Sequence, residues 1–376
     1  MSSTGPDSES KAALAILSDL PQRHEVLWFK FPRLVNCTLS FYEAGLKRQQ
    51  DLTVINPDFQ EPKSEENMEN QTNVLEFIIM GFLVRPELKP LLFTVSLFIY
   101  LLIICANLVI ILTVFVEPRL KTPMYFFLQN LSFLDIFCTS VTFPKLLAIF
   151  LEKSKSISFV GCITQMYFFL SFTSTEFYLL AAMAYDRYVA IHHPLHYTDI
   201  MNTRSCRLLV ALSWVPGFLD TVPHAVLGSQ LSFCGSSLIN HFFCDLTALV
   251  KLSCSDPRDI ESLIFAEGVF AGLIPFSITI TSYIYIIRVI LKIRSAEGRH
   301  KAFSTCSSHL TVVTVLYVSM FCMYVRPASS YSLDKDKLLA IVYTAFIPIF
   351  NPLIYSLRNK DMNKALKKLI GKKSIA

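Results

Sequence analysis

The sequence predicts an all-α membrane protein, a bundle of seven helices that cross a lipid bilayer. Of its 376 residues, 53% are hydrophobic and only 17% are charged, which is far from the composition of an average soluble domain. A helix needs about 20 apolar residues to cross a bilayer, and seven stretches of the sequence are long enough. They cover residues 91–116, 123–150, 159–191, 208–231, 260–291, 302–325 and 338–357.

The two ends of the chain are expected on opposite sides of the membrane, because seven is an odd number of crossings. Basic residues gather in alternate connections, whereas the other connections mix acids and bases. Cytoplasmic connections carry the excess of Lys and Arg. We therefore expect a multi-pass plasma membrane protein with its N-terminus outside and its C-terminus in the cytoplasm. The net charge of +5 then belongs to the cytoplasmic face, and the sequence shows no nucleic-acid-binding patch.

The bundle itself is expected to occupy residues 91–357. Residues 1–67 are mixed in character and lack the basic start and continuous apolar core of a signal peptide. We expect them to form a disordered N-terminal extension, followed by an extracellular tail at 68–90. Residues 358–376 are expected to form a cytoplasmic tail. Its first part is basic and amphipathic, which fits a short helix on anionic lipid or an ordinary solvated tail.

The third apolar stretch carries charged residues, which are costly inside a membrane and therefore indicate function. Glu176 lies in its middle and Asp186-Arg187 at its end. Glu176 and Arg187 share one helix face, about 16 Å apart at a rise of about 1.5 Å per residue. An Asp-Arg pair at a helix end can also be an ordinary solvated ion pair, so the pair alone does not establish a role.

Four motifs occur in order along the chain. They are KTPMYFFL at 121–128, MAYDRYVAI at 183–191, KAFSTCSSHL at 301–310 and PIFNPLIYSLRN at 348–359. In these motifs the chain resembles the odorant receptors, a branch of the rhodopsin-like G-protein-coupled receptors, over about residues 68–368. The resemblance implies a receptor that binds small, largely apolar volatile molecules within the bundle. It also implies activation of a stimulatory, olfactory-type heterotrimeric G protein, which raises cAMP.

The resemblance places the ligand in the outer half of the bundle. Apolar walls with a few hydroxyl groups suit a small volatile molecule, whose affinity comes mostly from burial, although most aromatic residues of membrane helices only pack. An ionised Glu267 would favour a cationic ligand such as an amine, whereas a protonated Glu267, or one that reaches outward to water, would not. The residues implied to bind the ligand are Phe169, Leu170, Thr173, Ser174, Glu267, Tyr317, Met320, Phe321, Tyr324 and Thr344.

The resemblance also implies where the signal leaves the bundle. In the expected two-state mechanism, helix six moves outward and Arg187 is freed to contact the G protein. Where many related receptors have an acidic partner in helix six, this chain has Lys301 and His309. The residues implied to couple to the G protein are Asp186, Arg187, Tyr188, Tyr283 and Tyr355.

Three polar residues from different stretches, Asp135, Glu176 and Asn351, are implied to meet in the middle of the bundle. Two carboxylates close together in hydrocarbon share a proton or recruit a cation. A sodium ion is therefore a candidate at this position, and we expect no other cofactor. Asp135, like the lone Asn107 of the first stretch, could equally be a buried polar group that neighbouring backbone satisfies.

Ten cysteines are scattered along the chain without the close pairs of a metal site. Cys162, Cys234, Cys244 and Cys254 fall in regions expected outside the cell, where disulfides form, and four cysteines allow three pairings. The resemblance implies the pairs Cys162–Cys244 and Cys234–Cys254, which would hold a long loop over the mouth of the bundle. Asn70 begins an N-glycosylation sequon on the same side.

Two other classes of membrane protein fit the sequence less well. A transporter or channel could use Asp135 and Glu176 as ion relays, but the sequence lacks repeated halves and paired broken segments. An intramembrane enzyme would need a nucleophile with a base, or a set of metal ligands, and His309 stands alone in its helix. The sequence therefore predicts a receptor and not an enzyme.

Overall fold

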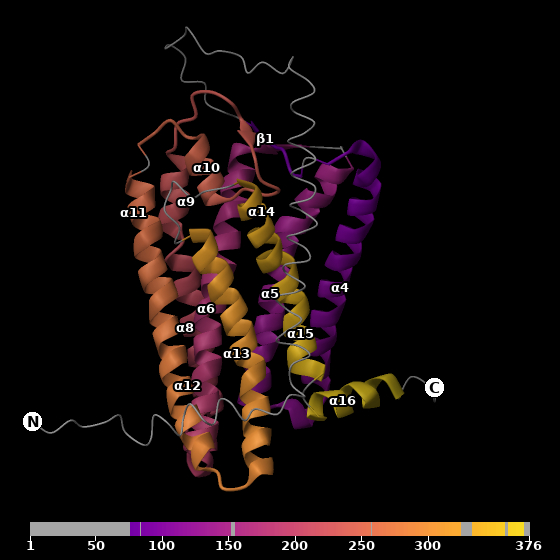
Figure 1. Ribbon diagram of the computed structural model, residues 1–376, viewed down its shortest axis with the longest axis vertical. Coiled ribbons are helices and arrows are strands. Elements are labelled where there is room, and N and C mark those ends of the chain that lie inside the picture. The colour runs from indigo at the N-terminus through magenta and orange to yellow at the C-terminus, as the bar shows by residue number, and fades with distance from the viewer. Residues whose placement is uncertain are drawn as a thin grey trace, which may run out of the picture. The chain divides into compact units, whose positions relative to one another are not determined.

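The computed structural model describes residues 76–82, 84–151, 155–256, 258–324, 333–357 and 360–371. Most of these residues are helical, and the long helices lie side by side in a bundle (Figure 1). Residues 1–67, the tail up to residue 75 and the sequon at Asn70 lie outside the described residues, so the expectations for them stay predictions.

The helices occupy the seven stretches that the sequence predicts. The first three crossings are α4 (Lys89–Val116), α5 (Pro123–Phe150) and α6 (Phe159–His192), and the sixth is α13 (Ala296–Tyr324). The fourth is α8 (Thr203–Leu219) with α9 (Val222–Ser229), the fifth is α11 (Arg258–Glu267), η5 (Gly268–Leu273) and α12 (Ile274–Lys292), and the seventh is α14 (Leu333–Ile341), η7 (Val342–Phe346) and α15 (Ile347–Leu357). Shorter helices are η2 (Pro86–Leu88), η3 (Pro118–Leu120), η4 (Pro194–His196), α7 (Tyr197–Ile200) and α10 (Leu246–Leu252), and α16 (Lys360–Gly371) follows the bundle.

Among the described residues, five helical runs are long and apolar enough to cross a membrane, and they belong to the first, second, fourth, fifth and seventh crossings. The other two, α6 and α13, have 34 and 29 residues, which is ample length at about 1.5 Å per residue, but they contain more polar residues. In α6 these residues are shielded from lipid, since Thr173, Ser174 and Glu176 are at most 6% exposed. The predicted seven-helix membrane bundle is therefore confirmed.

The central helix of the bundle is α6, because α5, α8, α9, α12 and α13 all pack against it. It begins after Ser158, whose hydroxyl accepts a hydrogen bond from the Gly161 amide at 3.1 Å and so caps the helix. It ends at His192, two residues before Pro194, which lacks the amide proton that a continuing helix needs. Its buried residues extend over nearly its whole length, so one helix connects both ends of the bundle.

Two crossings contain a π turn next to a proline. The turn η5 lies just before Pro275, and η7 lies just before Pro348. A proline cannot donate to the helical ladder, and single π turns are frequent at functional sites. Because a π turn changes the angular spacing of side chains, the faces of these two crossings do not follow one uniform helical period.

Gly217 sets the distance between α8 and α6. It is buried, and an added Cβ would lie 2.7 Å from the Thr175 amide nitrogen and 2.8 Å from the Thr175 Cα. Small residues at such positions let membrane helices approach closely. Just after α8, the Thr221 hydroxyl lies 2.6 Å from the Ser171 hydroxyl of α6.

A three-stranded sheet and two disulfides cover one end of the bundle. The middle strand, β1 (Glu76–Ile79), runs antiparallel to β2 (Ser156–Ser158) and parallel to β3 (Leu238–Ile239). We call this sheet, together with residues 230–256, the lid. The disulfide Cys162–Cys244 joins the lid to α6, and Cys234–Cys254 lies within the lid, which is the pairing that the resemblance implies.

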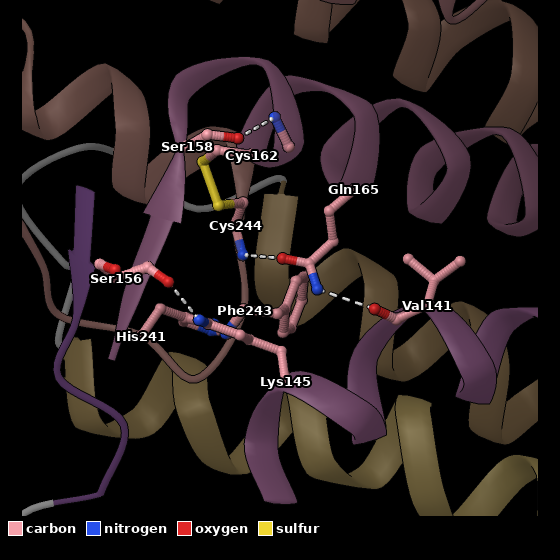
Figure 2. Close-up of a disulfide and its surroundings, with 10 residues drawn as sticks. Val141, Lys145, Ser156, Ser158, Cys162, Gln165, His241, Phe243 and Cys244 are labelled. Carbon is pink, nitrogen blue, oxygen red and sulfur yellow. Dashed lines mark hydrogen bonds between the residues drawn. A yellow bond between two sulfur atoms is a disulfide. The ribbon is translucent and has the colours of Figure 1, made fainter. Parts of the chain in front are cut away.

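The inner side of the lid is tied to two helices by Gln165 of α6 (Figure 2). Its side-chain oxygen accepts a hydrogen bond from the Cys244 amide at 2.9 Å, and its side-chain nitrogen donates to the Val141 carbonyl of α5 at 2.7 Å. Next to Cys244, the Phe243 ring packs on Phe169 of α6 with 4.6 Å between centroids. Polar and aromatic contacts thus hold the lid against α5 and α6.

A histidine in the lid is expected to make the stability of the receptor depend on pH. Burial lowers the pKa of the His241 imidazole from 6.5 to about 4, with Lys337 and Lys251 adding to the effect and Asp245 opposing it. Between these pH values the unfolded chain binds a proton that the folded lid does not. The folded state therefore loses stability as the pH falls from 6.5 towards 4, by about 3 kcal/mol at about 1.4 kcal/mol per pKa unit.

Thermal unfolding of the detergent-solubilised receptor at neutral and acidic pH measures this effect. The variant His241→Gln lacks the titrating ring, so its melting temperature is expected to fall less than that of the unmodified receptor on acidification. Other titrating groups are shared by both proteins and cancel in the comparison. Equal falls for the two proteins would show that His241 does not contribute.

The short amphipathic helix expected after the bundle is α16. Met362 and Ala365 are buried, whereas Lys364 is exposed. Lys368 donates a hydrogen bond to Glu117, just after α4, at 2.8 Å, and this bond lowers the pKa of the Glu117 carboxyl. Figure 1 shows α16 lying across the end of the bundle opposite the lid, which suits a helix on a membrane surface.

Candidate functional site

The middle of the bundle holds a buried polar cluster, which we call the axial group: Asp135, Thr173, Glu176, Tyr343 and Asn351. The Asn351 amide nitrogen donates to the Asp135 carboxylate, at 3.1 and 3.2 Å from its two oxygens. The Tyr343 hydroxyl lies 2.8 Å from Thr173 Oγ1 and 3.2 Å from Glu176 Oε2. The group joins α5, α6 and the seventh crossing, and it includes the three residues that are implied to meet there.

Two oxygen atoms of the axial group accept no hydrogen bond from the described residues. Glu176 Oε1 and Asn351 Oδ1 are buried, and neither has a hydrogen-bond partner among the described residues. Oxygen atoms that lack donors are the ligands that a hard cation takes. With the carboxylate of Asp135 beside them, these residues fit a sodium ion.

The sequence points to Thr344 and misses its neighbour Tyr343. Thr344 is buried, but its hydroxyl donates to the Ala340 carbonyl of its own helix at 2.7 Å. Both residues lie in the π turn η7, where the helical period changes, and it is Tyr343 that reaches α6. The one sequence signal that could have indicated Tyr343 is its position directly beside Thr344, an implied ligand residue.

The implied ligand residues of α6 lie between the lid and the axial group. Phe169 packs against Phe243 of the lid on one side and against Tyr343 on the other, with 5.6 Å between the centroids of the latter pair. Leu170 of α6 and Met320 of α13 are also buried. A ligand that touches Phe169 would therefore be one side chain away from the axial group.

Tyr317 joins three helices in the same half of the bundle. Its ring lies 4.9 Å from that of Phe177 in α6 and 4.8 Å from that of Phe276 in α12, and its hydroxyl donates to the Gly272 carbonyl of η5 at 3.4 Å. The side chains of Phe321 and Tyr324, the other implied residues near the end of α13, lie outside the described part of the structure and stay predictions.

Ser174 and Glu267 belong to a second polar cluster, which we call the lateral group: Ser174, Tyr178, Asp220, His224 and Glu267. The Ser174 and Tyr178 hydroxyls both donate to Asp220 Oδ2, at 2.9 and 3.2 Å. Glu267 Oε2 lies 2.8 Å from His224 Nε2. Thr173 and Ser174, which follow each other in α6, thus belong to two different polar clusters.

Asp220 and His224 are not among the residues predicted from the sequence, although a signal for them exists. Both lie inside the fourth apolar stretch, where a charged residue is a functional candidate by default. The structure shows the Glu267 side chain turned onto His224, with 19% of its surface exposed, and the alternatives for its charge stay predictions.

At the end of the bundle opposite the lid, Asp186 is held by the connection that follows α6. The Tyr197 hydroxyl of α7 donates to Asp186 Oδ1 at 2.8 Å, and burial raises the pKa of the Tyr197 phenol. Arg187 is 6% exposed, and the Tyr188 ring lies 5.2 Å from that of His192. Asp186 and Arg187 are therefore enclosed by protein and are not an ordinary solvated ion pair.

Near Arg187, His309 of α13 connects three helices. Its Nδ1 lies 2.8 Å from the Tyr283 hydroxyl of α12, and its Nε2 lies 3.1 Å from the Leu180 carbonyl of α6. A neutral imidazole with its proton on Nε2 satisfies both contacts, because it donates to the carbonyl and accepts from the hydroxyl. The side chain of Tyr355, the other tyrosine implied in coupling, lies outside what the structure describes.

A surface hollow of about 480 Å³ lies between α6 and α9. Its lining includes Ile163, Phe168, Val222 and Val226 and is mostly apolar. None of its lining residues belongs to the axial or the lateral group, and Phe168 and Val226 are 38% and 48% exposed. The hollow therefore opens to the surroundings of the bundle and is separate from the implied ligand site.

Seven membrane helices, a lid joined to the third of them by a disulfide and a buried Asp-Arg pair at the other end define a receptor of the G-protein-coupled class. Residues 96–373 match the family model described as olfactory receptor. Olfactory receptor 5AR1 of Mus musculus is 50% identical over 308 residues, which is 81% of this chain and 98% of that protein. Olfactory receptor 5AR1 of Homo sapiens is 49% identical, with 81% and 99% covered, and olfactory receptor 6B9 of Mus musculus is 48% identical, with 81% and 96% covered. The chain belongs to the olfactory receptor family and has the function of an odorant receptor.

Proposed function

We propose that this odorant receptor binds small, largely apolar volatile molecules between the lid and the axial group and activates a stimulatory, olfactory-type heterotrimeric G protein, which raises cAMP. In this proposal the lid lies outside the cell, and Arg187, α7 and α16 lie in the cytoplasm. The concentration of Lys and Arg in the connections on the side of Arg187 supports this orientation.

The contact of Tyr343 with both Thr173 and Glu176 carries the proposal. Its hydroxyl is 2.8 Å from an implied ligand residue and 3.2 Å from a buried carboxylate. A ligand that packs against Phe169 and Thr173 would touch the same tyrosine that holds Glu176. A ligand shifts a two-state bundle only when it binds one arrangement more tightly than the other. A ligand that displaces Tyr343 would bind the two arrangements with different affinities.

His309 supports the second step, in which helix six moves outward. Its contacts with Leu180 and Tyr283 hold α13 against α6 and α12 close to Arg187. Outward movement of α13 must break both contacts, because both partners belong to other helices. Their release would open the space in which a G protein reaches Arg187.

A sodium ion in the axial group belongs to the same proposal, with Asp135, Glu176 and Asn351 holding it and its single positive charge offsetting one of the two carboxylates. Replacement of sodium by choline in the medium is expected to change basal cAMP, and Asp135→Asn is expected to remove that change. Identical basal cAMP in both media would count against the ion.

The function itself is tested by odorant-evoked cAMP. Cells make the full chain with an olfactory-type stimulatory G protein and a trafficking helper, and a broad odorant panel is applied while surface display is recorded. At least one compound is expected to raise cAMP. Arg187→Ala, displayed at the same level, is expected to give no response, because it lacks the group that contacts the G protein.

Tyr343→Phe tests the ligand end of the bundle, as Arg187→Ala tests the G-protein end. It keeps the ring against Phe169 and removes the hydroxyl, so the concentration for half-maximal response is expected to change about tenfold or more, as the loss of a hydrogen bond to a charged group gives. A receptor that is well displayed yet silent to every compound would refute the proposed function, and ion flux would then be measured.

A further inference from the structure

The lateral group contains more acceptors and more negative charge than its own residues can satisfy. Its two carboxylates, Asp220 and Glu267, come from different crossings and face one histidine, His224, which is 1% exposed. Asp220 interacts electrostatically with both His224 and Glu267, so the three groups form one cluster. Two carboxylates face a single imidazole, so the group holds an excess of negative charge in a partly buried position, which is costly.

The hydrogen bonds within the group leave defined positions without a partner. The Ser174 and Tyr178 hydroxyls both donate to Asp220 Oδ2. Asp220 Oδ1 is buried and has no hydrogen-bond partner among the described residues, and the same is true of His224 Nδ1. The imidazole of His224 is turned into the group, since its Nε2 lies 2.8 Å from Glu267.

The missing component is a donor with a positive charge. An ammonium group has three N–H donors and no acceptor. It would donate to Asp220 Oδ1 and to the Glu267 carboxylate and would reduce the excess negative charge, and a charged hydrogen bond of this kind is stronger than a neutral one. A hydroxyl ligand has only one donor and leaves the charge in place. The chemistry of the group therefore selects a cation over an alcohol.

The surroundings suit the rest of such a ligand. The Tyr317 ring packs on Phe177, which precedes Tyr178 in α6, and on Phe276 of α12. An aromatic wall accommodates an alkyl chain and attracts a cation in its vicinity. Of the two residues in this contact Glu267 is the partly open one, with 19% of its side chain exposed against 0% for His224, so a ligand would approach from the side of Glu267.

We propose that the lateral group is a subsite for a protonated aliphatic amine, held between Asp220 and Glu267. This proposal rests on the proposed odorant-binding function and names the class of ligand for one part of that site.

Binding is tested without signalling, by thermal unfolding of the purified receptor with hexylamine and with hexanol, which share a carbon chain. The amine is expected to raise the melting temperature more than the alcohol. Glu267→Gln, which keeps the shape of the side chain, is expected to remove the advantage of the amine and to leave the effect of the alcohol unchanged. Asp259→Asn, which removes an exposed carboxylate from the same helix α11, is the matched control and should behave as the unmodified receptor.

The same pair of ligands is compared in the cAMP assay. Glu267→Gln and Asp220→Asn are expected to weaken the response to hexylamine about ten- to hundredfold, the range that loss of a charged hydrogen bond gives, with surface display recorded to detect misfolding.

Equal thermal shifts by amine and alcohol, or a Glu267→Gln receptor that still prefers the amine, would overturn the subsite. If neutral odorants raise cAMP while amines neither raise cAMP nor stabilise the receptor, the amine subsite would be overturned. The proposed function as an odorant receptor would still stand. If the amine stabilises the receptor through Glu267 but no compound raises cAMP, the subsite would be upheld. The proposed coupling to the G protein would be refuted.

Discussion

The Gly217→Ala receptor is expected to unfold at a much lower temperature than the unmodified receptor and to be largely absent from the cell surface. The new methyl group would lie 2.7 and 2.8 Å from the nitrogen and Cα of Thr175. These are backbone atoms, so the contact is relieved only if α8 moves away from α6. Overpacking of this kind costs about 3 kcal/mol, which is a large share of the stability of an ordinary protein.

The damage would extend beyond the contact itself, because hydrogen bonds cross the same interface. The Ser171–Thr221 and Ser174–Asp220 contacts, at 2.6 and 2.9 Å, both lie close to Gly217 in sequence and would lengthen. The matched control is Gly268→Ala, where an added Cβ meets no atom within 4 Å. Thermal unfolding and surface staining are measured for both variants. Equal melting temperatures and equal surface display of the two would mean that α6 and α8 are not tightly packed at Gly217.

Loss of the disulfide between the lid and α6 is expected to be the second most damaging change. The double variant Cys162→Ser, Cys244→Ser should lose about 2–5 kcal/mol of stability, as removal of a native disulfide typically does. The loss should also weaken the odorant response, because the same segment carries the Cys244 amide that bonds Gln165 and the Phe243 ring that packs on Phe169.

Two further cysteine variants serve as comparisons for this change. Cys234→Ser with Cys254→Ser opens a bridge of 20 residues instead of 82, and shorter loops gain less from closure, so its effect should be smaller. Cys105→Ser removes an exposed free thiol and should have no effect. The measurement is thermal unfolding with odorant-evoked cAMP, and a receptor that is as stable without Cys162 and Cys244 as with them would contradict the expectation.

The crossings could be predicted from the sequence because their signal is local. A run of apolar residues marks a membrane helix whatever its neighbours are, and each predicted stretch coincides with a crossing to within a few residues. The lid sheet gives no such signal. Its strands have 4, 3 and 2 residues and are brought together from three distant segments, so only the tertiary structure reveals them.

The candidate site could be predicted in part. Asp135 and Glu176 could be found because charged residues in apolar stretches are conspicuous one by one, and the resemblance implies that they meet Asn351. Tyr343 and the division into two groups could not, because they depend on a π turn and on how α8 crosses α6 at Gly217. Asp220 and His224 carried the same conspicuous signal as Glu176, and applying the same rule to the fourth stretch would have found them.

The middle position of β1 in the lid has a consequence for how the receptor is made. A ribosome adds about 5–20 residues per second, and about 160 residues separate Ile79 from its partner Ile239. β1 therefore waits on the order of 10–30 s for β3 after its own synthesis. During this time the edge of β1 that pairs with β3 is open to chaperones or to strands of other chains. Substitutions in Glu76–Ile79 should accordingly act on the yield of newly made receptor more than on the melting temperature of the finished one.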